Sequence, residues 1–281
     1  MGLKRRGDGH SVEQAKPDMV RAPHFDPSRP NIARIYDYFL GGKDHCRADR
    51  EQAAKIIAIA PYVPRLAVAN RTFLGRVVRY LAKEAGVRQF LDIGSGLPTR
   101  QNVHEIAQEA NADARVVYVD NDPLVLVHAR ALLATTPTTH VIDGDLRDSG
   151  RILGEASRFL DFSQPIAVLL FAILHFFPDG GEHDPYRIVS TLTDSLAPGS
   201  YLAISHVEPA PAMIEAAGAY TAADVAFRDH HGVLPFFNGT TLVEPGLVRL
   251  NEWRPDDHDS IYPSDWPDVP VWVLGGVGRK P

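Results

Sequence analysis

The sequence has a single cysteine, no long apolar run and no excess of basic residues, and each absence narrows what the protein can be. Cys46 has no partner for an intrachain disulfide, so stability must come from the core, and we expect a cytoplasmic protein. The longest apolar run, residues 167–174, is far shorter than the ~20 residues that span a membrane, so no membrane partner is expected. A formal net charge of −6 argues against a broad surface for nucleic acid.

Three regions of the chain differ in composition. Residues 1–30 hold charged residues and prolines but few apolar side chains, which predicts a disordered tail. Residues 31–86 carry apolar side chains at helical spacing in three stretches, 31–40, 48–60 and 65–85, which predicts a helical cap ahead of the first strand. Residues 87–281 alternate between strand and helix patterns and predict the core domain.

Five apolar segments of the core domain predict buried strands, at residues 90–93, 116–119, 141–142, 166–171 and 201–205. Strands that are apolar on both faces and separated by helices indicate an α/β fold with a parallel sheet covered on both sides. Residues 211–228 predict a further helix, and residues 247–253 and 271–276 predict an antiparallel pair that closes the sheet.

The first predicted strand runs into a glycine-rich turn, Asp92-Ile93-Gly94-Ser95-Gly96. Because glycine has no Cβ, such a turn lets a ligand approach the main chain. A strand-to-helix turn that needs glycine for its geometry alone is the alternative, since a short glycine pattern is a weak signal.

Polar side chains follow each of the five predicted strands: Asp92, Asp120, Asp145, His175 and His206. The carboxyl ends of parallel strands meet at one edge of a sheet, and a ligand binds where the winding of the sheet reverses. We therefore expect these side chains to converge on one crevice.

The charges at the strand ends favour one ligand over another. Asp120 can accept hydrogen bonds from both ribose hydroxyls, and Asp145 and the Leu146 N–H can face an adenine, although Asp145 could equally cap a helix. A nicotinamide dinucleotide is disfavoured because Thr99 replaces the third glycine of its fingerprint and Asp92 would repel a pyrophosphate. The cationic S-adenosylmethionine suits the same carboxylates.

Taken together, these residues resemble a known family. The series Asp92 to Gly96, Asp120 and Gly144-Asp145-Leu146 is similar to the first three motifs of the Rossmann-like class I methyltransferases. Residues 35–44, 70–74, 89–99, 117–123 and 169–176 resemble an S-adenosyl methyltransferase family found mainly in actinobacteria and long catalogued as a domain of unknown function. The likeness covers nearly everything from residue 31 onward.

The resemblance implies a Rossmann-like methyltransferase fold, with a mostly parallel seven-stranded sheet, helices on both faces and a helical cap before it. It also implies that S-adenosylmethionine is the cofactor and that these residues surround it: Asp92, Gly94, Ser95, Gly96, Asp120, Asn121, Asp145 and Leu146. Pro98 replaces the common third glycine of the cofactor loop and should stiffen it. If the cap folds over the crevice, Tyr36 could stack near the cofactor, and Lys43 or Arg71 could meet a carboxylate or phosphate of the acceptor.

Methyl transfer from an activated sulfonium requires the protein to align the acceptor, exclude water and, for a hydroxyl acceptor, take up a proton. His175 is the candidate base, because histidine titrates near neutral pH; a histidine packed against its aromatic neighbours is the alternative. Asp179, Glu182 and His183 could hold a metal, but their spacing is more typical of a solvated loop, so no metal is expected.

Three functional classes follow from these observations. The acidic charge and the cap favour a methyltransferase that acts on a small molecule, and the resemblance names no acceptor. A protein that binds S-adenosylmethionine or S-adenosylhomocysteine without catalysis is the first alternative, and a nicotinamide-dependent oxidoreductase is the second. The sequence gives no sign of an oligomeric state.

Overall fold

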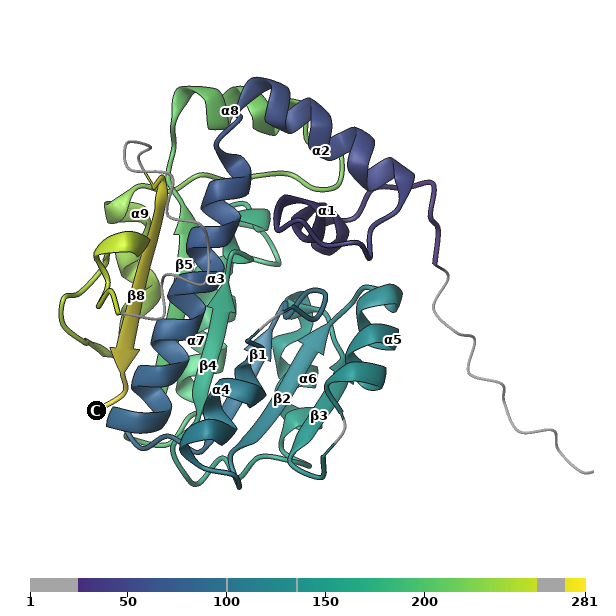
Figure 1. Ribbon diagram of the computed structural model, residues 1–281. Coiled ribbons are helices and arrows are strands. Elements are labelled where there is room, and N and C mark those ends of the chain that lie inside the picture. Colours follow the sequence, from purple (N-terminus) through teal and green to yellow (C-terminus); the bar gives the residue numbers. More distant parts are fainter. Residues whose placement is uncertain (1–24, 100, 135, 257–270) are drawn as a thin grey trace, which may run out of the picture.

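A computed structural model describes residues 25–99, 101–134, 136–256 and 271–281, so most of the predicted tail lies outside the described residues. Within them, one sheet runs in the order β3-β2-β1-β4-β5-β8-β6, and β7 also pairs with β8. Figure 1 labels strands β1 to β5 and β8 of this sheet. Its strands are β1 (Gln89–Ile93), β2 (Arg115–Asp120), β3 (Thr139–Asp143), β4 (Ala167–Phe171), β5 (Tyr201–Val207), β6 (Thr241–Leu242), β7 (Val248–Arg249) and β8 (Val273–Arg279).

The sheet confirms the predicted fold class and corrects one detail of it. Strands β1 to β5 are parallel, and β8 pairs antiparallel with β5, β6 and β7. The sheet has eight strands among the described residues rather than seven, because the two-residue strands β6 and β7 pair with different parts of β8. The antiparallel closing pair is present as β7 and β8, although the chain leaves β7 after Arg249 to form a short 3-10 turn.

Helices cover both faces of the sheet. The α-helices are α1 (Ile32–Phe39), α2 (Arg47–Ile59), α3 (Val63–Arg79), α4 (Val103–Ala110), α5 (Pro123–Leu132), α6 (Ser149–Ala156), α7 (Pro185–Asp194), α8 (Pro211–Gly218) and α9 (His230–Val233). The other helical segments are the π-helix η1 (Tyr80–Glu84) and the 3-10 helices η2 (Leu146–Asp148), η3 (Leu174–Phe176), η4 (Leu234–Phe237) and η5 (Leu250–Glu252). Side chains of each strand alternate between faces: Phe90 packs with α3 and α4, and Leu91 packs with α6 and α7. Right-handed crossovers explain this division, because the chain winds outward from β1 in both directions.

The three helices of the predicted cap cover different parts of the molecule. Helix α3 lies along one face of the sheet, where Phe73 and Val77 belong to the main core. Helices α1 and α2 share a separate small core with α8, built from Ile35, Ile56 and Ala216. Helices α1, α2 and α8, named the lid here, lie beyond the carboxyl ends of the parallel strands (Figure 1).

The predicted helix over residues 211–228 is wrong in its second half, because α8 ends at Gly218. The Gln52 side chain of α2 donates a hydrogen bond to the Ala219 carbonyl and accepts one from the Thr221 hydroxyl. This tertiary contact satisfies the end of α8 and turns the following residues across the molecule as a loop.

The turn between α1 and α2 explains the motif at residues 35–44. Asp37 is buried, and its Oδ2 accepts hydrogen bonds from the Asp44 N–H at 3.0 Å and from His45 Nδ1 at 2.9 Å. A Cβ on Gly42 would lie 2.0 Å from Asp37 Oδ1, so only glycine fits there.

No helix of the described part of the chain combines the length and apolarity needed to cross a membrane.

Candidate functional site

A cavity of about 440 Å³ lies between the carboxyl ends of the strands and the lid. It is lined by the nine residues predicted to surround the cofactor and by the candidate base: Tyr36, Asp92, Gly94, Ser95, Gly96, Asp120, Asn121, Asp145, Leu146 and His175. The predicted convergence of polar strand ends is therefore confirmed for Asp92, Asp120, Asp145 and His175. His206 does not line the cavity, and it is fully buried beside Phe236.

The two glycines of the turn, Gly94 and Gly96, have different structural roles. Both adopt left-handed backbone, with φ of 74° at Gly94 and 67° at Gly96. A Cβ on Gly94 would lie 2.3 Å from Cδ1 of Ile173, whereas a Cβ on Gly96 would meet nothing within 4 Å. Gly94 is thus required by packing, and Gly96 leaves the main chain open to the cavity.

Two buried carboxylates face this turn. Asp120 accepts hydrogen bonds from the Gly96 N–H and the Asp122 N–H, both at 2.9 Å, so it fixes the turn as well as lining the cavity. Burial raises the pKa of Asp120 to about 6. Burial also raises the pKa of Asp92 to about 7, against the opposing effect of the nearby Arg71 cation. Both carboxylates would therefore gain from a positively charged ligand.

The third carboxylate of the site, Asp145, is already engaged. Its oxygens accept hydrogen bonds from the Arg147 N–H at 2.9 Å, the Arg147 guanidinium at 2.9 Å and the Asn121 amide at 3.2 Å. The contacts of Asp145 therefore match the alternative that the sequence left open, in which this residue caps a helix. Leu146 beside it is buried against the cavity.

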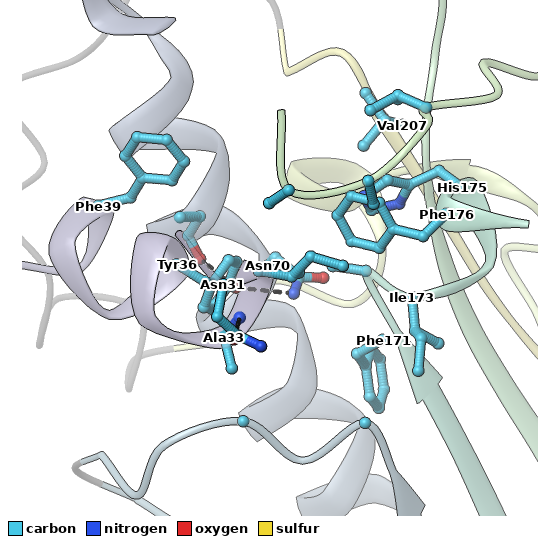
Figure 2. A pocket seen from close by; sticks show the side chains of 18 of the residues that line it. Asn31, Ala33, Tyr36, Phe39, Asn70, Phe171, Ile173, His175, Phe176 and Val207 are labelled. Carbon is cyan, nitrogen blue, oxygen red and sulfur yellow. Dashed lines mark hydrogen bonds between the residues drawn. The ribbon is translucent and has the colours of Figure 1, made fainter. Parts of the chain in front are cut away.

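A hydrogen-bond chain joins the lid to the sheet through residues of the cavity wall. The Tyr36 hydroxyl donates to the Ala67 carbonyl at 3.0 Å and accepts from the Asn70 amide at 2.9 Å (Figure 2). Asn70 in turn accepts from the Ser205 hydroxyl at 2.6 Å, and that hydroxyl accepts from the Ala172 N–H at 2.8 Å. Sequence reasoning missed the role of Asn70, although it lies in the segment 70–74 that carried the family resemblance.

His175 lies in the cavity wall, where Figure 2 shows it beside Phe176 and across from the lid residue Phe39. Its ring centroid is 4.1 Å from that of Phe176, and its buried Nδ1 has no hydrogen-bond partner among the described residues. Burial, together with the neighbouring His206 and Arg228, lowers the pKa of His175 well below its ordinary value. The imidazole is therefore neutral at physiological pH.

Arg228 holds the segment that carries His175, and no sequence signal pointed to it. It is buried, donates to the carbonyls of Leu174 and Phe177, and pairs with Asp179 at 3.0 Å through Nε. It also donates to Nε2 of His206 at 2.8 Å. Asp179 is thus an ion-pair partner of Arg228, and among the described residues no group of three or more His, Cys, Asp or Glu side chains is placed so that it could hold a metal ion.

The remaining cavity wall is mostly apolar. It includes residues from the lid, from η3 and from the loop that follows α8: Phe39, Phe176, Met213, Tyr220, Val225 and Phe227. The rings of Phe176 and Tyr220 are stacked, with centroids 5.9 Å apart. The cavity therefore has a polar half at the strand ends and an apolar half beneath the lid.

A family model described as S-adenosyl methyltransferase matches residues 18–281, nearly the whole chain. The chain belongs to the S-adenosyl methyltransferase family. The protein is thus an S-adenosylmethionine-dependent methyltransferase, and the nicotinamide alternative is wrong. The site fits this cofactor: Gly96 leaves space for it, two buried carboxylates favour its positive charge, and the buried Ser95 hydroxyl has no partner among the described residues.

Two solved structures resemble this methyltransferase closely. A DUF574 family protein from Streptomyces avermitilis is 41% identical, with a TM-score of 0.84, and the match covers 91% of this chain and 99% of that one. A proposed methyltransferase from Thermobifida fusca is 43% identical, with a TM-score of 0.82 and coverage of 90% and 96%. A search of curated proteins gave no significant match.

Proposed function

We propose that this methyltransferase transfers the methyl group of S-adenosylmethionine to a small, largely apolar acceptor that binds beneath the lid. The observation that carries the proposal is the continuity of the cavity from the strand ends to the apolar wall of α1, α8 and η3. A pocket of about 440 Å³ with few polar groups is typical of a small-molecule site. The stacked rings of Phe176 and Tyr220 favour a planar acceptor.

In this proposal the polar half of the cavity holds the cofactor. Asp120 accepts hydrogen bonds from the ribose hydroxyls, and the main chain at Ser95 and Gly96 approaches the cofactor directly. Asn121, with Asp145 and Leu146, lies beside the adenine. Asp92 lies near the cationic groups. Tyr36 contributes its ring to the wall, since its hydroxyl is engaged by α3.

His175 is proposed to receive the hydrogen of the acceptor O–H or N–H. When bound, S-adenosylmethionine supplies an activated methyl group, so the chain itself must orient the acceptor, exclude water and accommodate the proton. A neutral imidazole can accept a hydrogen bond from the acceptor. Because Arg228 and burial destabilise the charged form, His175 holds the proton only until the product leaves and solvent enters the cavity to take it up.

Calorimetric titration with S-adenosylmethionine and S-adenosylhomocysteine, followed by a screen for labelled methyl transfer to small planar phenols and amines, tests the function. Binding of both nucleosides with label transferred to a small acceptor supports the proposal. Binding without transfer to any acceptor, even in metabolite extracts, would favour the non-catalytic alternative.

The role of His175 has a separate test. His175→Ala should lower the rate of transfer, whereas the matched variant His183→Ala, at an exposed position outside the cavity, should not. Because the pKa of His175 is lowered, wild-type turnover limited by this group should persist as the pH falls below 6.5, the ordinary histidine value. Unchanged product formation by His175→Ala would dismiss the residue as the proton acceptor.

A further inference from the structure

Positive charge is scarce in the cavity wall. Among its described lining residues, only Arg71 and Arg147 are arginines, and no lysine is present. Arg147 is committed to Asp145, and its guanidinium lies 5.5 Å from the ring centre of Phe177. Nη2 of Arg71 donates a hydrogen bond to the Gln101 carbonyl at 3.2 Å, whereas the buried Nε of Arg71 has no hydrogen-bond partner among the described residues. Arg71 therefore retains donor capacity that the chain does not use.

Arg71 lines the cavity from helix α3. It follows Asn70 on α3, and its contact with Gln101 connects it to the segment between the glycine turn and α4. The positive charge of Arg71 lowers the pKa of Asp92, whereas burial raises it, so the two side chains attract each other. Asp92 lies in β1, whereas Asp145 and Arg147 follow β3, two strands away in the sheet.

The proposed cofactor has the same pair of charges at one end. S-adenosylmethionine carries an α-ammonium and an α-carboxylate on its methionine part, whereas its adenosine part is assigned to Asp120 and Asp145. The amino-acid part must therefore lie toward the other polar groups of the cavity. A guanidinium matches a carboxylate with two parallel hydrogen bonds, which a lysine cannot reproduce.

We propose, building on the proposed function, that Arg71 binds the α-carboxylate of the cofactor while Asp92 faces its α-ammonium. Arg71 is then the residue by which the site distinguishes a nucleoside that carries an amino acid from one that lacks it. The assignment differs from a role in binding an acceptor carboxylate, which the sequence left open for Arg71.

The test compares two nucleosides on the full-length protein. S-adenosylhomocysteine has the amino-acid part, and 5′-methylthioadenosine lacks it while keeping adenosine and sulfur. Calorimetric titration of Arg71→Gln should show an affinity for S-adenosylhomocysteine lowered about 10- to 100-fold, the effect of losing charge-assisted hydrogen bonds, with the affinity for 5′-methylthioadenosine within about twofold of wild type. Arg88→Gln, which removes the same charge from an exposed position outside the cavity, should change neither affinity.

The outcomes separate this inference from the proposed function. If wild type binds neither nucleoside, the proposed function fails. If wild type binds both, and Arg71→Gln weakens both equally or neither, the assignment of Arg71 is overturned; an effect confined to the KM of an acceptor would assign it to the acceptor instead. Arg71→Lys keeps the positive charge and provides a second test if Arg71→Gln does not fold. It should lower the affinity for S-adenosylhomocysteine alone, and equal losses of affinity for both nucleosides would contradict the proposal.

Discussion

Replacing Gly96 by alanine separates the two requirements for glycine in the cofactor turn. Gly96 and the remote Gly86 have nearly the same backbone, with φ of 67° and 69°, and a Cβ at either position would meet nothing within 4 Å. An alanine held in left-handed backbone costs about 1–2 kcal/mol at each site. Gly96→Ala and Gly86→Ala should therefore lower the free energy of unfolding equally, with a fall in Tm of about 2–4 °C per kcal/mol.

Cofactor binding should distinguish the two variants. The added methyl of Gly96→Ala enters the cavity beside the N–H that donates to Asp120, so it takes space that the proposed cofactor needs. We expect affinity for S-adenosylhomocysteine to fall more than about tenfold, which is a loss above about 1.4 kcal/mol. Gly86→Ala should bind as wild type does. Gly94→Ala adds a clash with Ile173 to the same backbone strain. Its free energy of unfolding should therefore be about 1–3 kcal/mol lower than that of Gly96→Ala or Gly86→Ala.

Urea titration and calorimetric titration on the four proteins measure both quantities. If Gly96→Ala binds S-adenosylhomocysteine as tightly as wild type, the cofactor does not need the space at this position. If Gly86→Ala weakens binding as much as Gly96→Ala, strain rather than lost space is the cause. A Gly94→Ala protein as stable as Gly86→Ala would contradict the packing role of Gly94.

Three further predictions concern charge, positioning and the lid. Because the pKa of Asp92 is raised to about 7, the group loses its charge as the pH falls, so affinity for S-adenosylmethionine should drop between about pH 8 and pH 6, with proton release on binding. In calorimetry, Asp92→Asn should remove the part of this dependence centred near pH 7 and leave the part due to Asp120, whose pKa is about 6; an unchanged pH profile would contradict the role of Asp92. Arg228→Met leaves two carbonyls and His206 without their donor and should lower the free energy of unfolding by about 2–4 kcal/mol in urea titration, with a loss below about 1 kcal/mol counting against the role of Arg228. Tyr36→Phe removes the hydroxyl between Ala67 and Asn70 and should cost about 1–2 kcal/mol of stability while keeping affinity for S-adenosylhomocysteine; a tenfold weaker affinity would show that the hydroxyl itself contacts the cofactor.

Local patterns in the sequence were sufficient for the strands and for the residues at their ends. Apolar runs that stop at Asp92, Asp120 or Asp145 mark buried parallel strands, and the topology of such strands brings their ends to one edge. The glycine turn and the start of α5 at an Asp-Pro pair are equally local, because turn and cap geometry depends on a few adjacent residues. The cavity residues at the strand ends and in the glycine turn are therefore predictable from local patterns, whereas Asn121 and Tyr36 were expected only through the family resemblance.

The tertiary structure alone decided what surrounds those residues. Asn70 and Ser205 bond across 135 positions, and Gln52 ends α8 from 167 positions away, so no local pattern announces either contact. The joining of α8 to α1 and α2, the burial of Arg228 behind η3 and the unused donor of Arg71 arise in the same way. The physical reason is that the partner of a polar side chain, and the pKa of a buried one, depend on which distant segments pack around it, whereas the periodicity of a strand or the geometry of a turn is a property of the segment itself.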